Sequence, residues 1–197
     1  MSTPHLVRFA KGVLAATICG LSITSCADLA RTGSGPSYLI MDAVQAAAGG
    51  GTATLSASLD SDVLVNGIAF LDRGQASIRV EMKNALSTTA PSPLSAITLN
   101  RYRVRFRRTD GQNREGIDVP FGFDGGTTVT IRAGSSGVVA FDLVRPQAKL
   151  EAPLRNLVGG GGLIRISAIA EVTFYGSDQA GNEVSVTGTI DVRFADF

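Results

Sequence analysis

A two-residue alternation of apolar and polar side chains runs through most of the chain and limits its fold more than any other feature. In residues 76–84, Ile78, Val80 and Met82 alternate with polar or charged side chains. Successive side chains of a β-strand point to opposite faces, so this pattern predicts half-buried strands. Shorter runs of the same kind occupy residues 127–132 and 138–144. No run of comparable length has a period of 3.6. Residues 147–157, interrupted by Pro153, predict at most one short helix.

A row of arginines marks another predicted strand. Tyr102, Val104 and Phe106 alternate with four arginines on the opposite face: Arg101, Arg103, Arg105 and Arg107. Upstream, Ile97 and Leu99 have the opposite parity, which predicts a β-bulge or a break near Asn100.

The longest alternating segments close the chain, at residues 163–175 and 183–194. In the first segment, the apolar face is expected to include Ile164, Ile166, Ala168, Ala170, Val172 and Phe174. The intervening residues 178–182 are rich in turn formers, because Gly and Asn tolerate positive φ. Together the two segments predict a β-hairpin with arms of roughly 40 Å.

Many strands separated by turn residues predict an all-β protein, an antiparallel β-sandwich, with residues 38–197 forming a single domain. The closing hairpin, with Asp178, Gly181 and Asn182 in its turn, resembles the last hairpin of bacterial immunoglobulin-like or fibronectin-III-like modules. The resemblance implies an immunoglobulin-like sandwich. The chain departs from antibody-type domains because it has no tryptophan and no cysteine pair within the predicted domain.

The first 25 residues have the layout of a secretory signal peptide. Arg8 and Lys11 precede an apolar run that ends at Ile23, and small residues follow. The run is shorter than the about 20 residues that a membrane-spanning helix needs. Residues 26–37 contain Gly, Ser and Pro and few apolar side chains, and we expect them to form a flexible tether.

The sequence Ile23-Thr24-Ser25-Cys26 resembles the lipobox of bacterial lipoproteins. The resemblance implies that Cys26 is lipidated, that the signal is removed before it, and that the new amino terminus is acylated. The residue after Cys26 is Ala27 rather than aspartate. In the lipoproteins of enteric bacteria, this resemblance favours the outer membrane over the inner membrane. We therefore expect export through the general pathway to a lipid-anchored place in the cell envelope, with the outer membrane favoured over the inner.

Cleavage before Cys26 removes the single histidine, His5, and one of the two cysteines, Cys19. With the remaining sulfur lipidated, Ser-His and Cys-His nucleophile pairs, a thiolate nucleophile, and Cys/His zinc, iron–sulfur or haem sites are excluded. The formal charge of the whole chain is +1 and becomes slightly negative without the signal, so nucleic acid is not an expected partner. We expect no enzymatic activity, no cofactor and no metal.

Loop carboxylates are the remaining candidates for chemistry. They are Asp60, Asp62, Asp110, Glu115, Asp118 and Asp124. Paired carboxylates could hydrolyse glycosidic bonds, and oxygen ligands could bind calcium, although no EF-hand pattern is present. The favoured interpretation is that these carboxylates are solvated charges in loops, without a catalytic or metal-binding role. The glycines of residues 159–162 precede no Lys-Ser/Thr and are interpreted as a flexible connection rather than a phosphate loop.

The arginine row has two interpretations. The arginines could bind anionic polymers, or acidic residues on neighbouring strands could neutralise them. The near-zero net charge favours neutralisation. The candidate acidic residues are Glu81, Glu171, Glu183 and Asp191. Phe121 and Phe123 also have two interpretations. Their rings could be exposed and stack on a ligand, or they could pack over the end of the sandwich and close it.

Three functional hypotheses follow. The first is a non-enzymatic module that binds an envelope or secreted protein, through the long hairpin or a sheet edge. The second is a glycan- or anionic-polymer-binding module that uses the arginine row and the two phenylalanines. The third is a carboxylate-dependent hydrolase. The sequence does not predict the oligomeric state.

Overall fold

The computed structural model describes residues 35–52, 54–84 and 91–197. The strands are β1 (Ser37–Ala47), β2 (Ser58–Asp62), β3 (Asp72–Met82), β4 (Ile97–Arg107), β5 (Phe123–Ile131), β6 (Ser135–Val144), β7 (Ile166–Asp178) and β8 (Glu183–Ala195). The helical elements are the α-helix α2 (Pro146–Leu150) and the 3-10 turns η1 (Pro93–Ser95) and η2 (Leu154–Leu157). The helical content predicted around Pro153 is therefore confirmed as α2 and η2.

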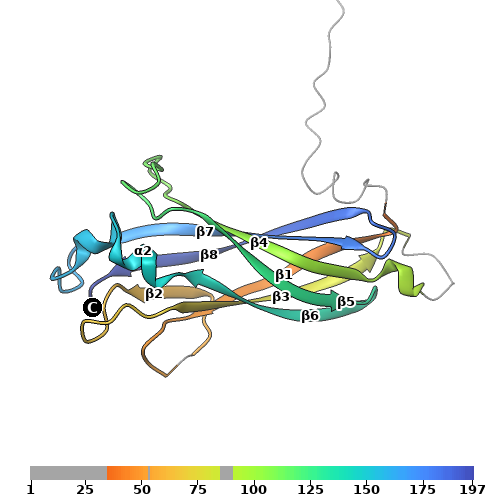
Figure 1. The fold of residues 1–197 in the computed structure, drawn as a ribbon, viewed down its shortest axis with the longest axis horizontal. Helices are drawn as coiled ribbons and strands as arrows, with labels where there is room; N and C mark the ends of the chain where they lie inside the picture. Colours follow the sequence, from red (N-terminus) through yellow and green to blue (C-terminus); the bar gives the residue numbers. More distant parts are fainter. Residues whose placement is uncertain (1–34, 53, 85–90) are drawn as a thin grey trace, which may run out of the picture.

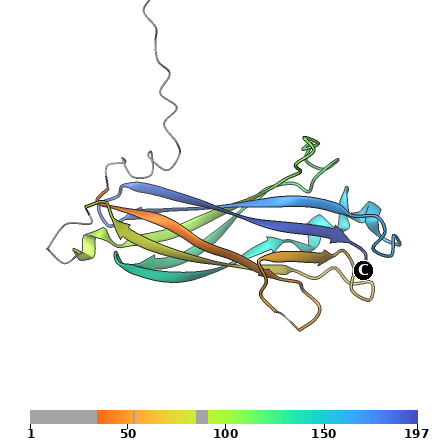
Figure 2. The same ribbon diagram turned by 180° about the vertical axis from the view of Figure 1, so that it is seen from behind.

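Two sheets pack face to face in an elongated sandwich (Figures 1 and 2). One has the strand order β1-β3-β6, and the other has the order β2-β8-β7-β4-β5. All neighbouring strands are antiparallel except β2, which runs parallel to β8 along one edge. The predicted all-β sandwich with a long C-terminal hairpin and one short helix is confirmed.

The closing hairpin is formed by β7 and β8, each 13 residues long. Its turn is organised by Asp178, whose Oδ1 accepts hydrogen bonds from the backbone N–H groups of Ala180 and Asn182 at 3.0 and 2.8 Å. The prediction that Ile164 belongs to the buried face is wrong. Ile164 is 59% exposed because the chain leaves a glycine-rich turn and enters the sheet only at Ile166.

The predicted break at Asn100 is confirmed as a bulge. The register of β4 shifts between Leu99 and Arg101 against both of its neighbours, β5 and β7. The extra residue lets Leu99 and Tyr102 both face the core, although they are three positions apart.

Three aromatic rings form the centre of the core. Tyr102 and Phe174 come from the five-stranded sheet, and Phe141 comes from the three-stranded sheet opposite. The ring centroids of Phe141 and Phe174 are 5.4 Å apart in an edge-to-face arrangement, and those of Tyr102 and Phe141 are 5.7 Å apart. The ring of Phe141 lies directly over Gly74 of β3, where a Cβ atom would overlap it.

Two strands are missing from the sequence-based prediction. β1 is not predicted, because Asp42 lies at a register shift that interrupts the alternation of apolar and polar residues in this strand. The sequence also placed Asp60 and Asp62 in a loop, whereas both belong to β2, which is only five residues long. Ser37, predicted as the last tether residue, is buried in β1 and donates a hydrogen bond from its hydroxyl to the carbonyl of Ser95 at 2.8 Å.

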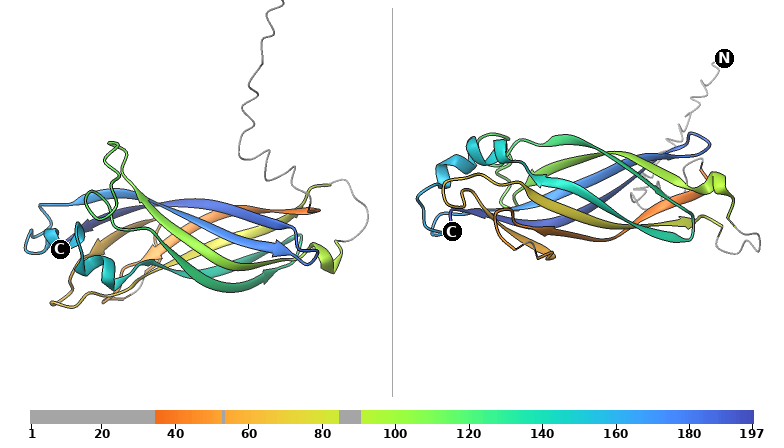
Figure 3. Two further views of the ribbon diagram at one scale, coloured as in Figure 1. Left: turned by 45° about the horizontal axis from the view of Figure 1, so that its top comes forward. Right: turned by 60° about the horizontal axis from the view of Figure 1, so that its bottom comes forward.

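The long strands separate two different ends of the molecule (Figure 3). At one end, Ser37 begins β1 beside η1 and the β7–β8 turn, and we call this the turn end. The carboxyl terminus lies at the opposite end, which we call the loop end, together with α2 and η2 (Figures 1 and 3). The loop end comprises residues 48–52, 54–57, 63–71, 108–122, 145–165 and 196–197.

A buried ion pair links the chain segments near the loop end. Nζ of Lys149 in α2 lies 2.9 Å from Oδ1 of Asp72, and the two side chains are 1% and 0% exposed. The same carboxylate accepts hydrogen bonds from the Ser61 hydroxyl at 2.6 Å and from the Gly49 backbone N–H at 2.8 Å. One carboxylate therefore joins β2, β3, α2 and the loop after β1.

Replacing Lys149 tests this link. Lys149→Met leaves a buried carboxylate without its cation, so the free energy of unfolding should fall by about 3–5 kcal/mol. The control is Arg79→Met, because Arg79 forms an exposed pair with Asp42. It should change the unfolding free energy by less than about 1 kcal/mol. Urea unfolding followed by circular dichroism measures both, and equal losses would contradict the assigned role.

Candidate functional site

The predicted arginine row lies on the outer face of β4, and most of it is paired. Arg103 forms two hydrogen bonds with the carboxylate of Asp124, from Nη2 at 2.8 Å and from Nε at 3.1 Å. Arg107 forms an ion pair with Glu171 at 3.3 Å. Arg101 lies 3.9 Å from Asp124, with its guanidinium 4.3 Å from the centre of the Tyr175 ring.

The partners differ in part from those that the sequence suggested. Glu171 lies beside the row because β4 pairs with β7. Glu81 lies on β3 of the other sheet and is 3.4 Å from Arg79. The main neutralising group is instead Asp124, because β5 pairs with the other side of β4 and places Asp124 opposite Arg103. Exposed pairs of this kind contribute little stability, but they occupy the arginines.

Arg105 is the exception. Among the ion pairs between described residues, none includes Arg105 or Glu115. Both side chains line a small hollow of about 120 Å³, together with Arg103, Gly122, Phe123 and Asp124. The structure thus brings Arg103, Arg105 and Phe123 together with two of the candidate carboxylates, whereas Arg101, Arg107 and Phe121 do not line this hollow.

The two phenylalanines have different surroundings. Phe123 is half-buried, and its ring contacts Tyr102 edge-on, with the ring centroids 6.4 Å apart. The guanidinium of Arg145 lies over the Phe123 ring, 3.7 Å from the ring centre. Phe121 is 55% exposed, and its ring lies over Gly116. Phe123 therefore packs against the sandwich, whereas Phe121 presents its ring to solvent.

Three of the four clustered carboxylates, Asp110, Asp118 and Asp124, are engaged by arginines rather than by one another. Asp110 pairs with Arg108, and Asp118 pairs with Arg114 at 2.8 Å. Hydrogen bonds from these arginines lower the pKa of both carboxyl groups, and the hydrogen bond from Arg103 lowers that of Asp124. A general acid for glycoside hydrolysis needs a raised pKa, so the hydrolase hypothesis gains no support from these groups.

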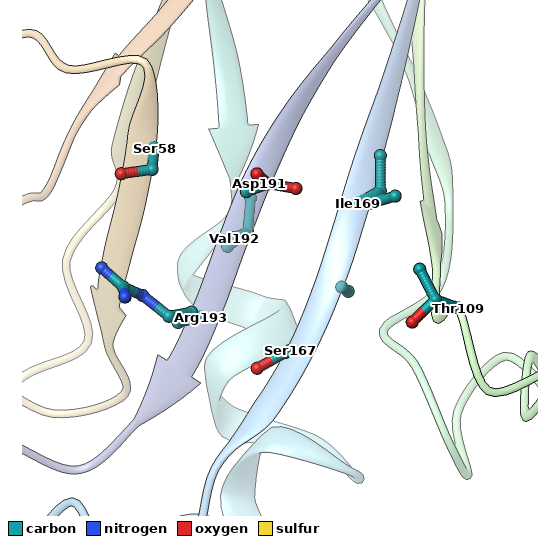
Figure 4. A pocket seen from close by; sticks show the side chains of 8 residues that line it. Ser58, Thr109, Ser167, Ile169, Asp191, Val192 and Arg193 are labelled. Atoms are coloured by element: carbon teal, nitrogen blue, oxygen red, sulfur yellow. The ribbon is translucent and has the colours of Figure 1, made fainter.

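A second hollow lies on the outer face of the five-stranded sheet (Figure 4). Its volume is about 450 Å³, and its lining includes three hydroxyl groups, from Ser58, Thr109 and Ser167. Asp191 and Arg193 of β8 also line it, although Arg193 is held by Asp60 through hydrogen bonds of 2.6 and 2.9 Å. Nothing in the sequence indicates this hollow, because it depends on the parallel pairing of β2 with β8.

Exposed apolar side chains gather at the loop end. Eleven large hydrophobic residues are exposed among the residues that the structure describes, and two of them, Leu94 and Val138, lie toward the turn end. The other nine lie at the loop end: Leu55, Ile68, Ile117, Phe121, Leu150, Val158, Leu163, Ile164 and Phe197.

Four of these nine residues form a group that we call the apolar tip: Val158, Leu163, Ile164 and Phe197. The backbone N–H of Gly159 donates to the Asp196 carboxylate at 2.6 Å, which holds the carboxyl terminus against the glycine-rich loop. A Cβ atom on Gly162 would lie 3.6 Å from the Phe197 ring, so the two segments are in contact. Leu163 is 88% exposed at this tip.

Cys26, the predicted lipidation site, lies outside the described residues. None of the described helices has the length and apolar character needed to span a bilayer. Within residues 35–52, 54–84 and 91–197, no three His, Cys, Asp or Glu side chains gather as a metal-binding group.

No protein-family model matches the chain, and no curated protein matches it either. Among solved structures, the chain is similar to the sporulation control protein Spo0M from Bacillus subtilis, with 12% identity and a TM-score of 0.28. The alignment covers 79% of this chain and 48% of Spo0M, so this chain spans about half the length of that protein. Nothing about function follows from a similarity of this size.

The pairing of Arg103 with Asp124 predicts a titration behaviour. In the wild type, the pKa of Asp124 should lie below the ordinary aspartate value, because the hydrogen bond from Arg103 favours the charged form. Arg103→Ser should raise this pKa toward the ordinary value, and Arg107→Ser should leave it nearly unchanged. Carboxyl ¹³C NMR titration measures all three. An unchanged pKa in Arg103→Ser would contradict the pairing.

Proposed function

We propose that the protein is a non-enzymatic, lipid-anchored module of the cell envelope that binds another envelope or secreted protein. The anchor is lipid on Cys26, and the outer membrane is its favoured location. The binding surface is the loop end, with the apolar tip at its centre.

The distribution of exposed apolar residues is the observation that carries this proposal. Exposed apolar side chains scattered singly are normal on a protein surface, whereas their concentration in one region marks an interaction site. Here they concentrate in connections at one end of a rigid sandwich, where binding residues of β-sandwich proteins are often carried.

The position of this end supports the same function. The described chain begins beside the β7–β8 turn, since a Cβ atom on Gly35 would lie 2.9 Å from Oδ2 of Asp178. A chain anchored upstream of Gly35 therefore attaches to the domain at its turn end. The apolar tip lies at the other end, on the far side of strands of 13 residues. The tip of the long hairpin is a poorer binding surface because it lies next to this attachment point.

The charges at the loop end indicate the chemistry of the partner. Arg108 and Arg114 are paired with Asp110 and Asp118 within their own loop. Lys149 is buried against Asp72. Three further cations of this end, Arg145, Arg155 and Arg165, are in no ion pair between described residues. Glu115, Glu151 and Asp196 at the same end match them in number, so the end as a whole has no strong positive field. Such a surface suits an apolar patch on a folded protein better than nucleic acid or anionic lipid.

A paired set of variants tests the binding surface. Leu163→Ser combined with Ile164→Ser removes two exposed aliphatic side chains from the apolar tip. Leu94→Ser combined with Val138→Ser removes two comparably exposed side chains elsewhere. Crosslinking in intact envelopes followed by purification should recover a partner with the wild type and the second variant. The yield with the first variant should fall by roughly tenfold. Equal recovery with both variants would refute the assignment of the apolar tip.

The anchor is tested separately. Intact-mass analysis of the protein extracted from membranes should show a chain that begins at Cys26 and carries acyl groups. Cys26→Ser should abolish this mass shift and the membrane attachment, because the lipid chains supply the binding free energy at about 0.8 kcal/mol per buried methylene. An unmodified Cys26, or a mature protein that retains His5, would contradict the proposed location.

A further inference from the structure

Two adjoining hollows lie at the junction of β5 with the loop that precedes it. Their volumes are about 190 and 120 Å³, and Gly122 and Phe123 line both. We call the two together the Gly122 groove. It does not include any residue of the apolar tip.

The smaller hollow contains two opposite charges, on Arg105 and Glu115, that are not held in an ion pair. Arg103 and Asp124 satisfy each other, whereas Arg105 and Glu115 have no ion pair among the described residues. A Cβ atom on Gly122 would lie 3.2 Å from Oε1 of Glu115 and 3.3 Å from Cγ of Arg105. It would also lie 3.0 Å from the carbonyl oxygen of Val104, so the absence of a side chain at Gly122 lets both groups approach the backbone of this loop closely.

The larger hollow adds an aromatic face and further polar groups. Phe121, more than half exposed, forms part of its wall, and Gln147 and Glu151 lie on the side formed by α2 and the residue after it. Arg145 is held in place, because its guanidinium stacks on Phe123 and its Nη2 donates to the Asp124 carbonyl at 2.8 Å. The groove thus has a fixed base with an exposed ring and ionisable groups around it.

We propose that the Gly122 groove binds an acidic saccharide, a sugar unit that carries a carboxylate, within a polysaccharide. The apolar face of a pyranose ring would lie against Phe121, and its hydroxyl groups would donate to Glu115 and Glu151 and exchange hydrogen bonds with Gln147. Arg105 would bind the sugar carboxylate with two parallel hydrogen bonds, the geometry that guanidinium groups favour.

The same residues disfavour a neutral ligand. A neutral sugar would offer no carboxylate to Arg105, whose charge acts on the nearby Asp124 without forming an ion pair with it. The groove belongs to the loop end but shares no residue with the apolar tip, so the variants of the two sites test the two proposals separately.

Calorimetric titration of the full protein in detergent with trigalacturonate tests the proposal, and galactotriose is the neutral counterpart. We expect saturable binding of the uronate with a Kd below about 1 mM, and binding of galactotriose weaker by at least about tenfold. Arg105→Ser removes the cation, and Gly122→Val fills the groove with a side chain. Each substitution should weaken uronate binding by at least about tenfold.

Arg107→Ser is the matched control. Arg107 lies on the same face of β4, has the same charge and is held by Glu171, but it lines neither hollow. It should bind trigalacturonate within about twofold of the wild type, and thermal melting should show that Arg105→Ser remains folded. Failure of the wild type to bind the uronate would overturn the proposal. Equal weakening by Arg105→Ser and Arg107→Ser would also overturn it, because it would indicate general charge attraction instead of a site.

Discussion

The packing of the two sheets against each other is the interaction on which the rest of this structure depends. Tyr102 and Phe174 from one sheet pack against Phe141 from the other, and the surrounding core consists of aliphatic side chains. The described domain contains no cysteine, so burial and backbone pairing must provide its stability without a disulfide. The bulge in β4 is part of this arrangement, because it brings Tyr102 into the core after Leu99.

Long strands also determine how function can be distributed over the molecule. The core occupies the middle of the sandwich, so the two ends are free to differ. One end contains the start of the domain and the Asp178 turn, whose side chain is occupied by local hydrogen bonds. The other carries longer connections, a buried ion pair and the apolar tip. A protein fixed at the first end offers the second to its surroundings.

The local features of the fold could be predicted from the sequence. The alternation of apolar and polar residues identifies β3, β4, β7 and β8, and the change of parity at Asn100 identifies the bulge. β2 could not be found in this way, because five residues with charges at both Asp60 and Asp62 give no clear alternation. The end of the buried face was also misplaced, since the pattern continues through Ile164 although the backbone turns away there.

The candidate sites were less predictable, because they depend on residues far apart in the chain. The sequence by itself determined the alternating row of arginines and the lipobox-like segment. Only the tertiary structure decided that Asp124 neutralises Arg103 and that Arg105 is in no ion pair among the described residues. It also decided that Lys149 is buried against Asp72, 77 residues away. Strand order fixes the pairing of Arg103 with Asp124, and the position of α2 beside β3 fixes that of Lys149 with Asp72. The alternation within each strand specifies which face is buried but not which element lies beside it.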